Sequence, residues 1–171
     1  MWPRAPPAPI SGTMVQMWLV RFVIVAATVA AMEGLATLVH RYVMHGWGWG
    51  WHRSHHAPRT GHVERNDLYA LLFAGANLLL FMVADIDGPV WWVGTGVAVY
   101  GLLYAALHDG LVHRRVPAPA VPRRGYLKRL VQAHRLHHAS RSREGAVSFG
   151  FLYAPPVQQL RRRMRSNGPM Q

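Results

Sequence analysis

Residues 40–56 read HRYVMHGWGWGWHRSHH and follow directly on an apolar run from Met14 to Val39. A helix needs about 20 residues to cross the hydrocarbon core of a bilayer, so this run is long enough to span a membrane. A cleaved signal peptide is the alternative, but the apolar run continues well past the alanine-rich stretch at 27–31. We therefore predict a first membrane span at about 14–39 that ends in a histidine-rich segment. The polar residues inside the run are Gln16, Arg21, Thr28, Glu33 and Thr37.

Two more apolar runs follow, from Leu68 to Ala84 and from Val90 to Leu107. Between them lies the stretch DIDGP at 85–89, which is typical of a tight turn. We therefore predict a helical hairpin with spans at about 68–84 and 90–107. The aromatic stretch 148–157 is too short to span a bilayer and is expected to be an interfacial or re-entrant piece, a fourth and partial membrane element.

These runs define one domain at 14–157, preceded by a Pro-rich disordered leader at 1–13 and followed by a basic tail at 158–171. The expected fold is an all-α integral membrane protein with three to four transmembrane helices and a cytoplasmic histidine-rich cap. Three spans place the histidine-rich segments on one side, together with most of the arginines. The positive-inside rule makes that side cytoplasmic.

The composition restricts the chemistry. Cysteine is absent, which excludes disulfides, thiolate nucleophiles and cysteine-held clusters. Any metal site must therefore use histidine or carboxylate ligands, and the eleven histidines outnumber the seven acidic residues. The formal net charge is +12, but the basic residues lie beside long apolar runs and the sequence has no nucleic-acid-binding motif. This favours basic membrane loops over a nucleic-acid partner.

Ten of the eleven histidines form a doubled pattern. Each half of the chain has a His-x4-His box at the end of an apolar run, followed by a His-x2-His-His box. Residues three and four apart share one face of a helix, so the second type of box points two or three imidazoles to one side. Ten imidazoles are too many for one tetrahedral ion and suit two metal ions. The candidate ligands are His40, His45, His52, His55, His56, His108, His113, His134, His137 and His138, whereas His62 lies outside the boxes.

Residue type alone does not select the metal, because imidazole binds zinc, copper, nickel and iron. Zinc would indicate hydrolysis or transport, which usually need a carboxylate base or a polar path through the bilayer. Two irons with open positions can activate oxygen. An apolar substrate entering from the lipid would explain the membrane setting.

The boxes and their flanks HDGLVHRR (108–115), RRGYLKRLVQAHRLHHA (123–139) and REGAVSFGFLYAP (143–155) resemble the bacterial β-carotene 3-hydroxylases. These form the carotenoid hydroxylase branch of the fatty acid hydroxylase and sterol desaturase superfamily, and the resemblance covers residues 32–156. It implies a di-iron centre with all ten histidines as ligands. It also implies O2-dependent hydroxylation at carbon 3 of the β-ionone ring, from β-carotene through β-cryptoxanthin to zeaxanthin, in the bacterial inner membrane.

Each hydroxylation needs two electrons, but the sequence has no dinucleotide fingerprint, flavin motif or cluster cysteines. The expected donor is ferredoxin with its NAD(P)H-dependent reductase. An acidic carrier would be attracted by Arg123, Arg124, Lys128 and Arg129, although topology alone also explains these charges.

Four carboxylates are candidates for supporting roles. Asp109, Asp67 and Glu64 are expected to hydrogen-bond ligand imidazoles or to be solvated. Glu33 lies seven residues before His40 on the same helical face, and is expected either to point toward the metal or to bond a neighbouring helix. The tryptophans at 47, 49 and 51 are expected to form an interfacial belt.

Three alternatives remain at the level of sequence. One is another membrane lipid oxygenase: a fatty acid or sterol hydroxylase, a carotenoid ketolase or a desaturase. A second is a bis-histidine haem membrane protein, and a third is a metal transporter, which would place its ligands within the spans. The oligomeric state stays open.

Overall fold

The computed structural model describes residues 12–58, 61, 63–115, 120 and 122–167, and these described residues form helices and loops without β-strands. The leader up to residue 11, His62, part of the linker after Arg115 and the last four residues lie outside the described residues. The helices, in chain order, are α1 (Gly12–Leu38), η1 (Val39–Trp47), α2 (Trp49–His56), α3 (Asp67–Val83), α4 (Pro89–Tyr104), η2 (Ala105–Val112), α5 (Gly125–His138) and α6 (Val157–Ser166). The segments η1 and η2 are π-helical continuations of α1 and α4.

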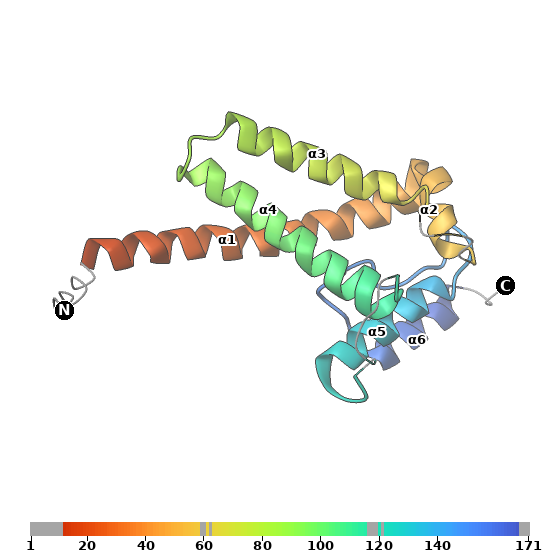
Figure 1. Ribbon diagram of the computed structural model, residues 1–171. Coiled ribbons are helices and arrows are strands. Elements are labelled where there is room, and N and C mark those ends of the chain that lie inside the picture. The colour runs from red at the N-terminus through yellow and green to blue at the C-terminus, as the bar shows by residue number, and fades with distance from the viewer. Residues whose placement is uncertain (1–11, 59–60, 62, 116–119, 121, 168–171) are drawn as a thin grey trace, which may run out of the picture.

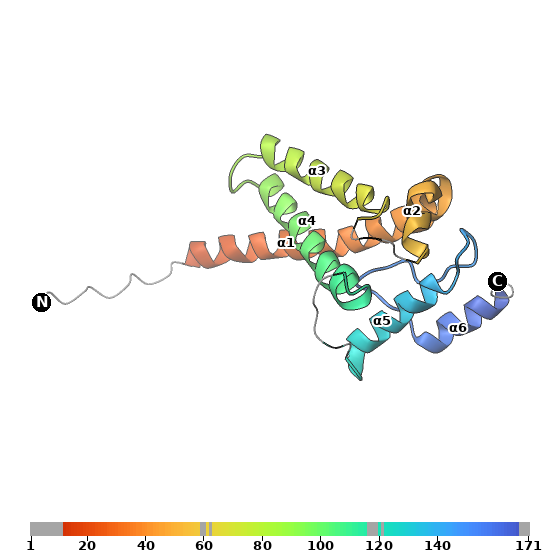
Figure 2. The same cartoon turned by 45° about the vertical axis from the view of Figure 1, so that its right-hand side comes forward.

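The three long helices form the apolar part of the molecule. Helices α3 and α4 make the predicted hairpin, and α4 crosses α1 (Figures 1 and 2). A Cβ atom on Gly96 would lie 2.5 Å from the Cβ of Thr28, so glycine is what allows α4 to approach α1 this closely. The hairpin turn is closed by a bond from the Gly88 N–H to the Asp85 carbonyl, and Pro89 opens α4 as its first residue.

Two described helices are long and apolar enough to cross a membrane. They run over Gly12–Trp47 and Pro89–Val112, with mean hydropathies of 2.1 and 1.5, and little of either is buried inside the protein. The apolar helix α3 has 17 residues and a rise of about 26 Å, somewhat shorter than the roughly 30 Å of a hydrocarbon core. Large apolar side chains such as Phe22, Met82 and Leu102 are exposed on all three helices. These outward faces fit a lipid environment.

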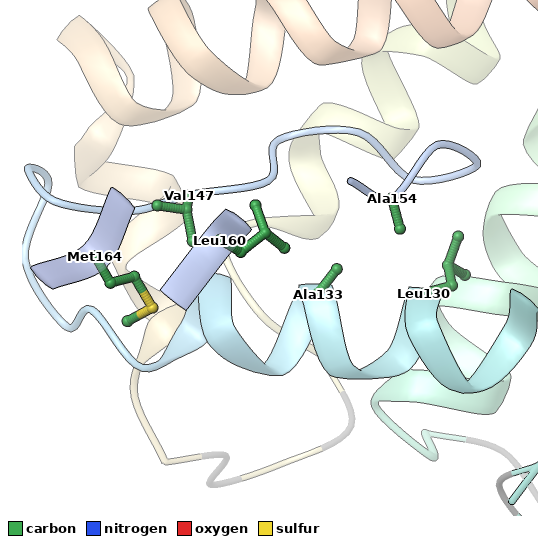
Figure 3. Packing of buried hydrophobic residues seen from close by; sticks show 6 residues of the cluster. All are labelled: Leu130, Ala133, Val147, Ala154, Leu160 and Met164. Carbon is green, nitrogen blue, oxygen red and sulfur yellow. The ribbon is translucent and has the colours of Figure 1, made fainter. Parts of the chain in front are cut away.

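The other helices gather at one end of α1 and α4 (Figure 1). There α5 and α6 pack on each other through a small apolar core, shown in Figure 3 and made of Leu130, Ala133, Val147, Ala154, Leu160 and Met164. The predicted basic tail therefore begins with a helix that belongs to this core. Leu160 is fully buried, and Met164 lies one turn further on the same face. The aromatic segment 148–156 forms no helix and runs as an irregular loop.

Candidate metal centre

The ten boxed histidines, which are distant in sequence, converge where η1, α2, η2 and α5 meet. Nine of the ten fall into two groups whose ring nitrogens lie within 4.8 Å of one another. We call the first group site A; it contains His40, His45, His52, His56 and His137. The second group contains His55, His113, His134 and His138. His108 joins it, because its Nε2 lies 3.1 Å from the Nε2 of His55, and these five residues make up site B.

Each site takes most of its histidines from one half of the chain and one histidine from the other half. Within the box at 52–56, His52 and His56 belong to site A and His55 to site B. Within the box at 134–138, His134 and His138 belong to site B and His137 to site A. The first and last histidines of each box are four residues apart and share a helical face. The middle histidine precedes the last one directly and points about 100° away from it. Each His-x2-His-His box therefore places ligands at both sites.

The two His-x4-His boxes lie in the π-helical segments. In η2 the His113 N–H donates to the His108 carbonyl at 2.9 Å, an i to i+5 bond, and both imidazoles point into site B. His40 and His45 lie in η1 in the same way and enter site A. Short π-helical turns inside α-helices are rare and frequently mark functional sites.

Seven of the ten imidazoles are fixed from outside by a hydrogen bond from Nδ1–H to an oxygen. The acceptors are the carbonyls of Phe149 for His40, Arg143 for His45, Ser140 for His56 and Val147 for His137, and the side chains of Asn66 for His52, Glu64 for His55 and Asp109 for His108. Because none of these oxygens can donate a proton to the ring, Nδ1 is the protonated nitrogen. The Nε2 lone pair of each ring then points inward, which is the arrangement that metal-bound histidines show.

The inward nitrogens are too close to one another without a cation between them. The Nε2 atom of His52 lies 3.1 Å from that of His40 and 3.2 Å from that of His56, although all three rings carry their proton on Nδ1. The pairs His45 with His137 and His55 with His108 show the same contact, at 3.2 and 3.1 Å. Lone pairs facing each other at this distance repel. A metal ion between them would turn that repulsion into coordination.

The spacing also bears on the geometry that an ion would adopt. With metal–imidazole bonds of about 2.1 Å, nitrogens 90° apart are about 3.0 Å from each other, against about 3.4 Å in a tetrahedron. The Nε2 contacts of 2.9 to 3.2 Å fit the right-angled arrangement. The five imidazoles of each site could hold one ion. The same crowding leaves no room for the four pyrrole nitrogens of a haem, which argues against the bis-histidine haem alternative.

The electrostatics keep these imidazoles neutral. Burial lowers the pKa of His52 to about 3, of His56 to about 4 and of His113 to about 3. Burial also lowers the pKa of His134 and His137 well below the usual value. Neutral imidazole is the metal-binding form, so the rings are ready to coordinate at neutral pH.

The carboxylates predicted to support the ligands divide into two kinds. Glu64 and Asp109 accept from His55 and His108, as the expectation for them required. Asp67 bonds none of the imidazoles that the structure describes; it accepts two bonds from Arg115 at 2.7 and 2.6 Å, and this pairing lowers the pKa of its carboxyl. Arg115 also lies 3.7 Å from Asp109, which accepts from His108. Asp67 is therefore linked to site B through Arg115 and Asp109. Asn66, which holds His52, carries no charge and is not singled out by the sequence.

Glu33 holds a loop rather than a ligand. One carboxylate oxygen accepts the main-chain N–H groups of Phe151, Leu152 and Tyr153 at 2.8 to 3.0 Å, and the other accepts the Tyr100 hydroxyl. A Cβ on Gly150 would lie 2.6 Å from this carboxylate, so only glycine allows the loop to close around it. The loop in turn supplies the Phe149 carbonyl to His40. Glu33 therefore positions site A from within the apolar helix.

Aromatic rings cover the histidines. Trp49 packs against His45, His52 and His56 at ring distances of 5.1 to 5.9 Å, whereas Trp47 is 85% exposed. The expected uniform belt of three tryptophans is thus wrong for Trp49, because it folds onto site A. On the membrane side, Phe151 stacks on His40 and Tyr104 on His108, at 5.1 and 4.4 Å.

An apolar cavity of about 530 Å³ lies next to the two sites, among the apolar helices. Helices α1, α3 and α4 form most of its walls. Several of the lining residues are small, such as Ala36, Ala74 and Gly101. Its lining includes Phe151 and Tyr104, whose rings stack on His40 and His108 and so separate the cavity from the two sites. The cavity can take an apolar molecule and bring one end of it close to the imidazole clusters.

Comparisons with known proteins agree with this geometry. The family described as fatty acid hydroxylase matches residues 10–155. The chain is 55% identical over 150 residues to a β-carotene hydroxylase of Pantoea ananas, covering 87% of this chain and 86% of that protein. It is 57% identical over 148 residues to a β-carotene hydroxylase of Pseudescherichia vulneris, covering 86% and 84%. A chloroplastic β-carotene 3-hydroxylase of Arabidopsis thaliana is 34% identical over 139 residues, which cover 78% of this chain and 44% of the plant protein. No solved structure matches significantly.

Proposed function

The chain belongs to the fatty acid hydroxylase family, and from that premise we propose that it hydroxylates carbon 3 of the β-ionone rings of carotenoids, converting β-carotene through β-cryptoxanthin into zeaxanthin. The reaction consumes one O2, two electrons and two protons per hydroxyl group and releases one water. The two bacterial relatives above are each more than half identical to this chain over most of its length. They support a carotenoid over a fatty acid or a sterol as the substrate.

One observation carries the proposal: two clusters of five imidazoles lie side by side next to an apolar cavity, and Phe151 and Tyr104 contact both the cavity and the imidazoles. All ten boxed histidines would be the metal ligands, five from site A and five from site B. Iron is the metal that the family supports, and two iron ions would supply the activation of O2. The protein residues fix the imidazoles, exclude water from the cavity and orient the ring.

The cavity supports an elongated hydrocarbon substrate. Its lining is apolar apart from Asn66, Asn77, Asp109 and the tyrosine hydroxyls, and its walls are helices with lipid-facing outer surfaces. The substrate's ring would lie against Phe151 and Tyr104, and its polyene would extend between α3 and α4. Entry from the membrane fits a molecule that is insoluble in water.

The proposed topology has three spans with the histidines at the cytoplasmic surface of the bacterial inner membrane. At the far end, Arg21 pairs with Asp87 of the hairpin turn and lies over the rings of Trp18 and Trp92. From Arg21 to His40 the helix rises about 29 Å, close to the thickness of a hydrocarbon core. The α3–α4 hairpin covers the same depth, which supports α3 as a span despite its 17 residues. The functional domain would extend over residues 14–157.

Electrons would come from outside the chain, from ferredoxin and its NAD(P)H-dependent reductase. The sequence has no cysteine and no nucleotide-binding fingerprint with which to hold a redox cofactor of its own. A soluble carrier would reach the histidine-rich face without crossing the membrane. The oligomeric state is not part of the proposal.

The test is to express the chain in bacteria that accumulate β-carotene and to analyse the pigments by chromatography with mass detection. We expect products one and two oxygens heavier than β-carotene that comigrate with β-cryptoxanthin and zeaxanthin. His134→Ala, expressed to the same level in the membrane, should give unchanged β-carotene. Arg53→Ala, an exposed change on α2, serves as the control and should behave like the wild type.

Unchanged β-carotene with iron-loaded wild-type protein in the membrane would refute the carotenoid assignment and direct the search to another lipid. Products that carry a keto group instead of a hydroxyl would refute the hydroxylation.

A further inference from the structure

A second opening reaches the metal centre from the polar side. A cavity of about 420 Å³ is lined by four histidines of site B, His55, His113, His134 and His138, and by one of site A, His56. It shares no lining residue with the apolar cavity between α1, α3 and α4. Two separate cavities therefore lie beside the metal centre, one apolar and one polar, and the polar one is lined by the histidines themselves.

The polar opening touches both sites, but it exposes site B more than site A. All five histidines of site A are buried, and Trp49 covers three of them. In site B, His113 and His138 are only half-buried. Their ring edges are therefore the parts of the metal centre that a molecule outside the protein can approach most closely.

The rim of this opening is basic. Arg135 and Arg141 lie on it, and both are exposed. The one acidic residue in the lining, Glu64, is held by the imidazole of His55. The rim therefore presents positive charge directly around the exposed histidine edges.

The positive charge continues along α5. Arg124, Lys128 and Arg135 are all exposed and recur at four and seven residues, which places them along one side of the helix. This stripe runs up to the opening and is about 16 Å long. A surface of this size and charge suits a small acidic protein.

We propose that the rim of Arg135 and Arg141, extended by Arg124 and Lys128, is the docking surface of an acidic electron-carrier protein that delivers electrons through the ligands of site B. The inference rests on the proposed function, because hydroxylation takes two electrons that this chain cannot store. The proposal places the carrier at the end of α5 that carries Arg135. The sequence alone suggests only the basic cluster at 123–129, at the other end of this helix. Site A then receives its electron by way of site B.

Anionic lipid head groups are the other possible partner for basic residues at a membrane surface. Lipid would interact with exposed arginines in general, whereas a docked carrier needs those at the opening. Arg161 and Arg162 on α6 provide the comparison, because both are exposed and neither lines the opening. The pair Arg161→Glu and Arg162→Glu makes the same charge change as Arg135→Glu and Arg141→Glu.

The experiment measures the affinity of purified, iron-loaded protein in neutral detergent for a plant-type [2Fe–2S] ferredoxin at two salt concentrations. We expect Arg135→Glu with Arg141→Glu to weaken binding at least about tenfold and to flatten its salt dependence. The Arg161 and Arg162 pair should change it by no more than about twofold. An equal effect of both pairs, or wild-type affinity in the Arg135 and Arg141 pair, would overturn the proposal.

A second measurement keeps this result separate from the reaction itself. Protein reduced with dithionite and given O2 and β-carotene should form the same amount of product in one turnover with or without the Arg135 and Arg141 changes. Loss of this single turnover in the double variant alone would mean that the changes damage the metal centre, and would also overturn the docking assignment. Absence of product in the wild type would refute the proposed function, whereas the binding result would still decide the docking surface.

Discussion

The main-chain N–H of His113 bonds the carbonyl of His108 at 2.9 Å, so one π-helical turn joins two histidines of the same site. In a regular α-helix, residues five apart point about 140° away from each other. The wider turn brings them onto one face. The His-x4-His spacing is therefore suited to a π-helix, and the box at 40–45 uses the same solution in η1.

Adjacent histidines should serve different ions. We expect His55→Ala with His138→Ala, both in site B, to lower the iron content to about one ion per chain. His55→Ala with His137→Ala removes one ligand from each site and should lower the occupancy of both. Iron per chain, measured by mass spectrometry after purification, together with the Mössbauer spectrum, distinguishes one intact site from two damaged ones. The same iron content and the same Mössbauer spectrum in both variants would contradict the assignment of His55 to site B and His137 to site A.

Asn66 should matter for metal binding although it touches no ion. Its side-chain oxygen accepts from His52 at 2.7 Å, and Asn66→Leu removes this acceptor while keeping the same number of side-chain heavy atoms. Loss of such a supporting contact typically costs 10- to 100-fold in metal affinity or activity, and we expect a loss in that range. Asn66→Asp keeps an acceptor and should retain most of the affinity in a chelator competition. Equal losses in both variants would indicate a packing role instead.

Glu33 should stabilise the loop at 149–153. Glu33→Ala leaves three main-chain N–H groups and the Tyr100 hydroxyl without their acceptor, so we expect a loss of about 2–4 kcal/mol in unfolding free energy. Iron should be lost first from site A, because His40 depends on the Phe149 carbonyl. Tyr100→Phe removes one donor only and should cost less than about 1.5 kcal/mol. Thermal unfolding in detergent compares the variants, and a larger loss from Tyr100→Phe would contradict the assignment.

Filling the apolar cavity should block the substrate without disturbing the metal. Gly101 lines the cavity, and a side chain added there meets no atom within 4 Å, so Gly101→Leu extends into open space. We expect hydroxylation of β-carotene to fall at least about tenfold with iron content unchanged. Gly75→Leu is the matched control, because Gly75 also has nothing within 4 Å but does not line the cavity. Wild-type conversion by the Gly101 variant would argue against this cavity as the substrate site.

The sequence predicts the helices closely because long apolar runs and turn signals are local. The expected runs at 14–39, 68–84 and 90–107 correspond to α1, α3 and α4 within a few residues, and the hairpin turn is where DIDGP places it. Helix α6 is missed because its arginines dominate its composition. Leu160 and Met164, four residues apart, are the signal that indicates a buried face.

The candidate ligands could be read from the boxes, but their division between two sites could not. That division depends on how α2 and α5 face each other, which is a tertiary relationship. The acceptors at Phe149, Arg143, Ser140 and Val147 are main-chain carbonyls, so no side-chain pattern predicts them. Of the two expectations for Glu33, the bond to a neighbouring helix is confirmed by Tyr100 of α4, whereas its bonds to a loop more than a hundred residues away are not predicted by the sequence.

The exchange of His55 and His137 also sets the order in which the protein can mature. While the chain is being synthesised, the first half reaches the membrane with four histidines of site A and only one of site B. Neither set of five is complete until the helix at 125–138 has been made and has docked. Iron loading is thus a late event that ties the two ends of the polypeptide together, and an incomplete chain cannot assemble an oxygen-activating pair.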